Sequence, residues 1–206
     1  MALTPVAKLA LESALTEPSA YTEIKAILEG TDHTNPLTAG TGITTGTDTV
    51  YKSWKEQNGG VIHTSIYIDI DGLNSNSAKD VIGKDATANC HLGQYTTAVM
   101  GTVFAGRMTC LETPTTGEPD IDLVSSNVST GTEDVAYDHS DMGTETVLLA
   151  AGQDWLAGLS ANQYNSAAIT ALPTANDYFY LCGSGGGTDN TYDTGKFLIE
   201  FWGTAS

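Results

Sequence analysis

The chain has 206 residues and a formal net charge of −17 at pH 7, with 40% hydrophobic and only 16% charged residues. A chain of this length can bury a core, and the composition is that of neither a disordered segment nor a charged helical rod. Nucleic acids and anionic membranes are bound by clustered cations, so this acidic chain is expected to bind neither. We expect a solvated acidic surface, the alternative being a partner with a basic face or cations between subunits.

The first 48 residues differ in composition from the rest of the chain. Residues 4–29 are predicted to be helical, because a capping threonine and a proline stand at their start, and Pro18 is expected to end or kink the helix. Residues 31–49 are rich in threonine and glycine, which indicates a linker or an extended arm. The sequence therefore predicts an N-terminal helical segment and arm at 1–48 and a β domain at 49–206.

The start of the β domain carries the pattern of a hairpin. Two apolar runs flank Asn58, Gly59 and Gly60, and Asn-Gly favours a tight turn because both residues tolerate positive φ angles. The second run has a period of two, which predicts a half-buried strand. Its two predicted faces are Ile62, Ile66, Ile68 and Ile70 on one side, and His63, Ser65, Tyr67 and Asp69 on the other.

A second hairpin is predicted from residues 88–98 and 102–112, which flank a short turn. In the register in which the numbers of paired residues sum to 200, the apolar side chains of both strands share one face, and Cys90 lies opposite Cys110. These two cysteines are then either packed thiols or a cross-strand disulfide. With Cys182 the chain has three cysteines and no CxxC pair, which argues against a disulfide-stapled scaffold and against a zinc site.

Further short β runs follow along the chain, and the last of them has apolar side chains on both faces. Such a strand is expected in the centre of a sandwich or at a subunit interface. Several short strands separated by turn-rich spacers predict a mainly β fold, an antiparallel β-sandwich of jelly-roll type with a short N-terminal helical segment. These further runs are 120–124, 145–150, 176–182 and 196–202, and Glu200 is the only charged residue within KFLIEFW after its first lysine.

Two pairs of carboxylates are candidates for a cation site. Asp69 and Asp71 flank one isoleucine, and Asp120 and Asp122 flank another. Alternate residues of a strand place both carboxylates on one face, but a calcium site needs six or more oxygen atoms, usually from a loop. We therefore expect solvent-facing strand residues, with cation binding as the alternative.

No other motif predicts catalysis. The histidines do not pair at helical spacing, and the chain has no G-x-S-x-G elbow, although a scattered Ser-His-Asp triad stays open. The stretch Gly183–Gly187 follows a predicted strand, but acidic residues and no Lys-Ser/Thr pair come after it, so a surface loop is expected. We predict no catalytic, cofactor-binding or metal-binding residues. The four histidines are His33, His63, His91 and His139.

Four stretches carry a resemblance: VYKSWKEQNGGVIHTSIYIDIDGL, DVIGKDATANCHLGQ, MTCLETPTTGEPDIDL and DYFYLCGSGGGTDNTYDTGKFLIEFWG. Through them, residues 50–203 resemble small structural proteins of tailed phages, especially marine and cyanobacterial phages. The resemblance implies a virion protein without enzymatic activity, with capsid decoration, or cement, as its function. It also implies a homotrimer on the capsid surface that binds the major capsid protein and stabilises the shell.

Two readings compete with decoration. One is a tail or fibre component that binds host glycans, with aromatic platforms at Trp54, Trp155, Tyr164 and Tyr192, although an isolated aromatic residue is more often part of a core or an interface. The other is an enzyme such as a glycan hydrolase, which only the abundance of carboxylates favours. The chain has no signal peptide pattern and no apolar run near the roughly 18 residues of a membrane span. Free cysteines suit a protein that folds in a reducing bacterial cytoplasm, so a virion protein made in the host cytoplasm is expected.

Overall fold

The computed structural model describes residues 35–46, 48–75, 77–150, 155, 165–184 and 190–205. The helical segment predicted at 4–29 lies outside these residues. The described elements are α3 (Thr41–Thr44), β1 (Val50–Asn58), β2 (Val61–Asp69), β3 (Asn74–Ser75), α4 (Thr97–Met100), β4 (Thr102–Thr115), β5 (Ile121–Ser126), the 3-10 turn η1 (Ser140–Met142), β6 (Glu145–Leu149), β7 (Asn165–Ala168), β8 (Tyr178–Gly183), β9 (Asn190–Thr191) and β10 (Thr194–Thr204).

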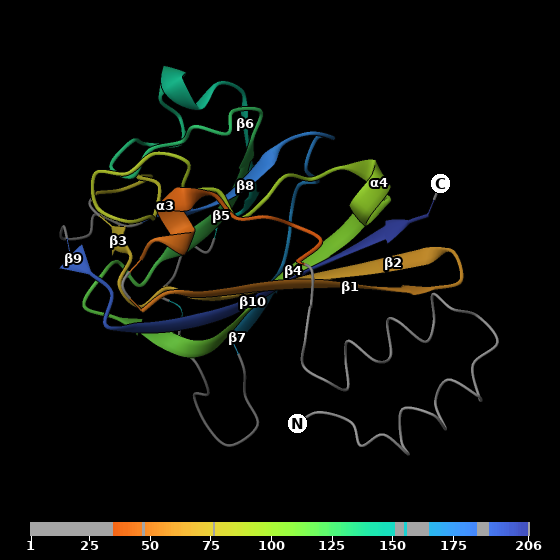
Figure 1. Ribbon diagram of the computed structural model, residues 1–206, viewed down its shortest axis with the longest axis horizontal. Coiled ribbons are helices and arrows are strands. Elements are labelled where there is room, and N and C mark those ends of the chain that lie inside the picture. The colour runs from red at the N-terminus through yellow and green to blue at the C-terminus, as the bar shows by residue number, and fades with distance from the viewer. Residues whose placement is uncertain are drawn as a thin grey trace, which may run out of the picture. The chain divides into compact units, whose positions relative to one another are not determined.

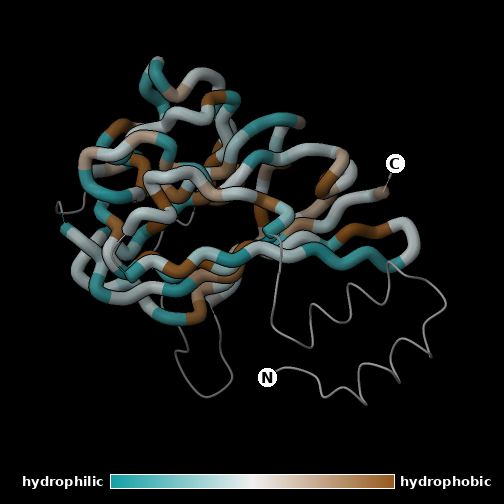
Figure 2. Tube along the Cα trace, in the orientation of Figure 1, coloured by the Kyte–Doolittle hydropathy of each residue, from teal (hydrophilic) through white to brown (hydrophobic). Residues whose placement is uncertain are grey.

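The first predicted hairpin is confirmed. β1 and β2 pair antiparallel from Val50 opposite Asp69 to Asn58 opposite Val61, and Gly59 and Gly60 form the tip. Gly59 has a φ angle of +59°, which a residue without a Cβ adopts at little cost. β1 is the edge strand of the sheet in Figure 1, and it is largely exposed and hydrophilic (Figure 2).

Five strands form the larger sheet, in the order β1-β2-β10-β4-β7, and every pair is antiparallel. β10 lies in the middle, as its apolar residues on both faces predicted. Its inward side chains, Phe197, Ile199 and Phe201, are fully buried, whereas Leu198 and Trp202 on the opposite face are partly exposed. The alternation of the sequence therefore orients the sheet, with one face toward the core.

A three-stranded antiparallel sheet, β6-β5-β8, covers the inward face of the larger sheet. Phe179 of β8 stacks on Phe201 of β10 with ring centroids 4.6 Å apart, and Trp155 meets Phe197 edge to face at 5.8 Å. All four side chains are at least 98% buried, so these contacts hold the two layers together through apolar burial. A short third sheet pairs β3 with β9.

The predicted mainly β, antiparallel, sandwich-like architecture is thus confirmed, but its jelly-roll type is not. A jelly roll divides eight strands between two sheets, whereas the described strands divide into sheets of five, three and two. The arrangement is a large sheet with a smaller one packed on its inner face.

The second predicted hairpin is wrong. β4 pairs with β10 and β7, and residues 88–98 form no strand beside it. Their backbone instead bonds to distant segments, since Leu92 N donates to Phe179 O at 2.7 Å and Cys90 N to Gly131 O at 2.9 Å. The predicted apolar face is buried at Cys90, Leu92, Met108 and Cys110, but Phe104 on the same predicted face is 51% exposed. The alternation therefore indicates burial only in part, and it does not identify the partner segment.

The compact unit that holds the sheets runs from Pro36 to Ser206, so it begins before the predicted boundary at residue 49. Leu37, Ala39 and Ile43 belong to its core, and Ile43 has no exposed surface. Ser53 of β1 anchors this segment, because its hydroxyl donates to Leu37 O at 3.0 Å and lies 3.1 Å from Leu37 N. Residues 36–46 are therefore part of the β domain and not of a free arm.

Candidate interaction surface

The larger sheet turns its second face away from the core, and we call the following side chains of that face the outer face. They are defined by the strand register, which aligns them across four neighbouring strands, and by the alternation of side chains along each strand. The outer face consists of Lys52, Trp54 and Glu56 on β1, His63, Ser65, Tyr67 and Asp69 on β2, Lys196, Leu198, Glu200 and Trp202 on β10, and Arg107, Thr109 and Glu112 on β4.

Glu200 lies at the centre of the outer face and is only 6% exposed. Arg107 on the neighbouring strand donates from Nε to Glu200 Oε2 at 2.9 Å and also bonds through Nη2. On the other side, His63 Nε2 lies 3.0 Å from Glu200 Oε1. A carboxylate removed from water is stabilised by such charge-assisted hydrogen bonds, so both neighbours hold it in one orientation.

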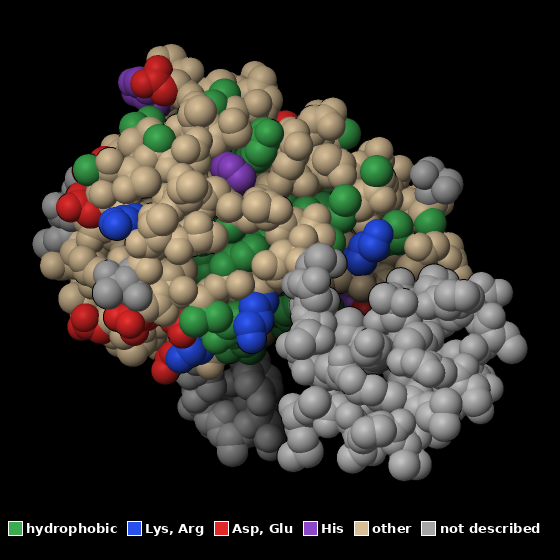
Figure 3. Space-filling model, viewed as in Figure 1, with side chains coloured by type: hydrophobic (Ala, Val, Ile, Leu, Met, Phe, Trp, Pro, Cys, Tyr) green, Lys and Arg blue, Asp and Glu red, His purple; other side chains and the backbone are tan. Residues whose placement is uncertain are grey.

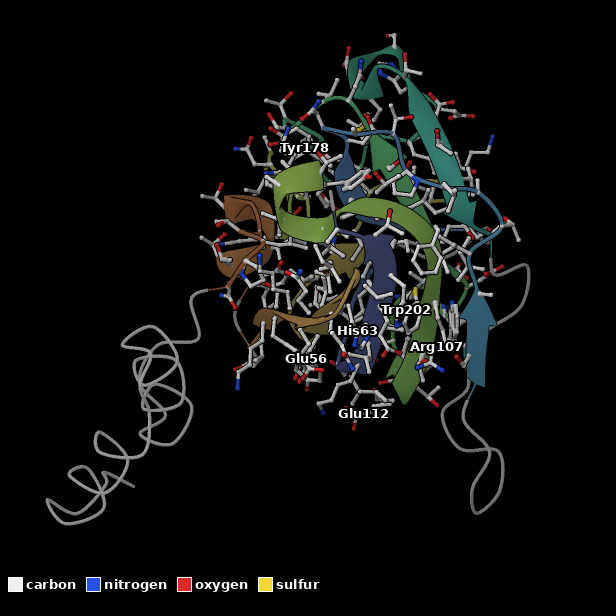
Figure 4. All side chains as sticks on the ribbon, turned by 90° about the vertical axis from the view of Figure 1, so that its right-hand side faces the viewer. Glu56, His63, Arg107, Glu112, Tyr178 and Trp202 are labelled. Atoms are coloured by element: carbon white, nitrogen blue, oxygen red, sulfur yellow. The ribbon has the colours of Figure 1, made fainter. Side chains whose placement is uncertain are left out.

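Ring stacking fixes the same group of side chains. The imidazole of His63 lies parallel to the indole of Trp202, with an interplanar angle of 2° and centroids 5.0 Å apart. The guanidinium carbon of Arg107 lies 5.6 Å from the centre of the Trp202 ring, within the range of a cation–π contact. Figure 4 shows His63, Trp202 and Arg107 side by side. The centre of the outer face is therefore a packed layer of side chains above the sheet.

A second ionic group lies toward the end of the outer face near Asp69. Lys196 Nζ lies 3.5 Å from Asp69 Oδ2 and also pairs with Glu112. The hydrogen bond to Glu112 raises the pKa of Lys196 above its ordinary value. Burial and the nearby Asp69 raise the pKa of Tyr67, so its hydroxyl stays protonated at neutral pH.

The outer face differs from the rest of the chain in its charge balance. It carries three cations, Lys52, Arg107 and Lys196, against four carboxylates, whereas the whole chain has a net charge of −17. The described residues contain six lysine and arginine residues, so half of them lie on this face. A second macromolecule can therefore approach here with less repulsion than over the acidic remainder.

The residue types of the outer face are those that anchor protein–protein contacts. Tryptophan, tyrosine and arginine dominate binding hot spots, and Trp54, Trp202, Tyr67 and Arg107 supply all three types on one sheet face. Trp54, Trp202 and Tyr67 are partly exposed, so each still has apolar surface to bury. Paired charges around them provide the polar rim that specific interfaces have.

The two predicted carboxylate pairs differ in their surroundings. Asp69 pairs with Lys196, and Asp71 follows it in a turn where burial and the neighbouring carboxylates raise its pKa. Asp122 is 2% exposed and stands opposite Cys182, so it is not the solvent-facing residue that the sequence predicted. Within the described residues, no group of three or more His, Cys, Asp or Glu side chains has the geometry to hold a metal ion.

The remaining predicted residues scatter over the fold. Of the histidines, His63 lies on the outer face, His91 in the segment between β3 and β4, and His139 before η1, where it pairs with the exposed Asp141. His33 and most of Gly183–Gly187 lie outside the described residues.

Three of the four aromatic platforms proposed for glycans lie among the described residues, and of these three only Trp54 is not buried. Trp155 is 2% exposed and donates from Nε1 to Ile121 O at 2.7 Å. Tyr192 has no exposed surface, and its hydroxyl donates to Glu118 O at 2.8 Å. Trp54 is partly exposed on the outer face, and Tyr164 lies outside the described residues. Trp155 and Tyr192 therefore serve the core.

Sequence reasoning missed the cluster around Glu200. It noted Glu200 as the charged residue of an apolar run, but it could not place Arg107 opposite, because the two residues lie 93 positions apart. The signal that points to the cluster is a lone acid in a two-sided apolar strand together with the single arginine of the chain.

Comparison with known proteins adds no relative: no family model, no curated protein and no solved structure matches the chain. Among the described residues, no helix is long and apolar enough to cross a membrane.

Proposed function

We propose that this protein is a virion structural protein, a capsid decoration protein without enzymatic activity that binds the major capsid protein and stabilises the shell. The resemblance of residues 50–203 to phage structural proteins supports the assignment to a virion. The outer face is the single observation that supports the mode of action, because it combines exposed tryptophan and tyrosine with balanced charge on an otherwise acidic chain.

In this proposal the outer face binds the major capsid protein and the subunits associate as a homotrimer on the capsid surface. The rigid layer around Glu200 lowers the entropic cost of binding, because its side chains are already ordered before contact. Several copies held together bind with avidity, so each contact can be weak while adjacent shell subunits still resist separation. The protein is made in the host cytoplasm and acts mechanically on the assembled particle.

The experiment uses particles of the source virus that lack this chain and asks whether the purified protein pellets with them. The wild type should cosediment, and a variant with Trp54→Ala and Trp202→Ala should not. Because these substitutions remove partly buried rings, Lys52→Glu serves as a second variant on an exposed side chain. Leu172→Ala is the matched control, since Leu172 is 49% exposed but lies in the loop after β7, outside the outer face.

Light scattering on the same samples gives the oligomeric state, with a trimer expected. A wild-type protein that stays in the supernatant overturns the proposal. Equal pelleting of the wild type and both folded outer-face variants overturns the assignment of this face.

A further inference from the structure

A hollow of about 590 Å³ lies on a different part of the domain from the outer face. Its walls are the segment Pro36–Thr41, the segment Asn89–Thr96 and Tyr178 at the start of β8. Figure 4 shows Tyr178 well apart from the labelled residues of the outer face. The volume is within the range of about 300–1,000 Å³ that small-molecule sites occupy. We call this hollow the Tyr178 groove.

Backbone hydrogen bonds hold the walls of the groove in place. Gly40 N donates to His91 O at 2.8 Å and Gly42 N to Asn89 O at 3.1 Å, which ties the first wall to the second. Phe179 N donates to Gly93 O at 3.0 Å, which ties the second wall to β8. The hydroxyl of Tyr51 lies 2.5 Å from Leu92 O, beneath the same segments. The groove is therefore formed before any ligand binds.

The lining of the groove carries no formal charge, although the chain has 25 acidic residues. Hydroxyl and amide side chains supply its hydrogen-bonding groups, notably those of Thr38, Thr41, Asn89 and Gln94. His91 is the only titratable group of the lining apart from the phenol of Tyr178, and burial lowers the pKa of this imidazole, which favours its neutral form. In Figure 3 most of the visible Asp and Glu side chains lie along the left side of the view.

Two aromatic rings form one side of the groove. His91 and Tyr178 are in contact, with centroids 4.8 Å apart and planes tilted by 60°, and Tyr178 is partly exposed. His91 Nδ1 is buried and has no hydrogen-bond partner among the described residues. The Cδ2 edge of the imidazole faces Gly40 on the groove wall. The groove thus combines an apolar ring surface with neutral donors and acceptors.

From this combination we infer that the Tyr178 groove binds a neutral saccharide, a function beyond the proposed binding of capsid protein. A sugar ring has an apolar C–H face, which packs on an aromatic ring, and a rim of hydroxyl groups, which hydroxyl and amide side chains bind in both directions. The acidic surroundings disfavour anionic ligands, and the absence of a carboxylate in the lining disfavours cationic ones. The saccharide belongs to a host-surface polysaccharide or is free in solution.

The test is binding of the full-length protein to an array of neutral oligosaccharides that includes gluco-, galacto-, manno- and N-acetylglucosamine trisaccharides, with sialylated and uronic-acid glycans alongside. We expect selective binding to neutral glycans, a loss of tenfold or more with Tyr178→Ala, and near-complete retention with Tyr178→Phe, which keeps the ring. Thr41→Val, on an exposed hydroxyl, should weaken binding about threefold. Trp202→Ala on the outer face should leave it unchanged, which separates this site from the proposed capsid contact.

Isothermal titration calorimetry then measures two affinities for a trisaccharide that binds on the array, once as the free sugar and once as the end of a polysaccharide. The form that binds more tightly identifies the source. Three outcomes overturn the inference: no neutral glycan binds, only acidic glycans bind, or folded Tyr178→Ala binds as well as the wild type.

Discussion

Arg107, the only arginine of the chain, donates hydrogen bonds from Nε and Nη2 to the carboxylate of Glu200 on the neighbouring strand. The pair is asymmetric in exposure, since the side chain of Arg107 is 47% exposed and that of Glu200 only 8%. The guanidinium therefore covers a carboxylate that is otherwise cut off from water, and its removal leaves Glu200 in contact with His63 Nε2.

Replacing Arg107 with methionine should lower the free energy of unfolding by about 1–2 kcal/mol, less than for a fully buried pair because water screens the exposed arginine. Urea denaturation measures this change. In a Glu200→Gln background the same substitution should cost much less, and the cycle should give a coupling energy of about 1 kcal/mol. Lys79→Met is the control, because Lys79 and Asp138 are both about half exposed, so water screens their ion pair and its loss should change the free energy of unfolding far less. A coupling energy near zero would contradict the described geometry.

The stacked rings of Phe179 and Phe201 join the two sheets. Phe179→Ala should lower the free energy of unfolding by about 3–5 kcal/mol, because it removes a fully buried ring and leaves a cavity between the layers. Phe104→Ala removes the same atoms from a side chain that is 51% exposed and should cost less than about 1 kcal/mol. Chemical denaturation of both variants compares them, and equal losses would speak against the packing of the sheets.

All three cysteines should be free thiols that react slowly in the folded protein. Each is buried, and burial raises the pKa of Cys90 to about 12 and that of Cys110 to about 11, so the reactive thiolate is scarce. Ellman's reagent should label three thiols quickly in guanidinium chloride and very few without it, and the intact mass should not change on reduction. A mass increase of two hydrogen atoms on reduction would instead reveal a disulfide.

Glu133 should make the domain less stable as pH rises toward neutrality. Burial, with a contribution from Asp134, raises its pKa from 4.5 to about 7, although Ala86 N and Asn74 donate to it. Between these two values the folded state keeps a proton that the unfolded chain has lost, so stability falls across this window and is constant above it. The total loss from this group is at most about 3 kcal/mol.

Glu133→Gln should remove that part of the pH dependence, as measured by urea midpoints between pH 4.5 and 8. Glu145→Gln is the matched control and should keep the wild-type slope. The same slope in Glu133→Gln as in the wild type would contradict the assignment.

The sequence predicts those parts of this fold that depend on local pattern. The β1–β2 hairpin follows from Gly59 and the alternating isoleucines, and the central position of β10 in its sheet follows from the apolar residues on both of its faces. It does not predict the partner of residues 88–98, because Gly93, at a φ angle of +132°, and Asn89, at +59°, turn the backbone away from a strand. The backbone of residues 88–98 then forms hydrogen bonds with segments far away in the sequence, and local sequence patterns do not identify these segments.

The same limit applies to the two surfaces. The residues of the outer face lie on four strands, and their grouping depends on the order β1-β2-β10-β4. The Tyr178 groove is built from three segments up to 142 positions apart in the chain, Pro36 to Tyr178. Alternation shows which side chains of a strand share a face, but the neighbouring strand has to be known before a site can be assembled.

The most direct test of the central claim is photo-crosslinking from the outer face on intact particles. A benzophenone amino acid replaces Lys52, which is exposed on β1, and a matched protein carries it at Leu172. After assembly and irradiation, mass spectrometry identifies the crosslinked chain. We predict a crosslink to the major capsid protein from position 52 and none from position 172. A crosslink from position 172 alone, or none from either position on particles that contain the protein, would contradict binding through the outer face.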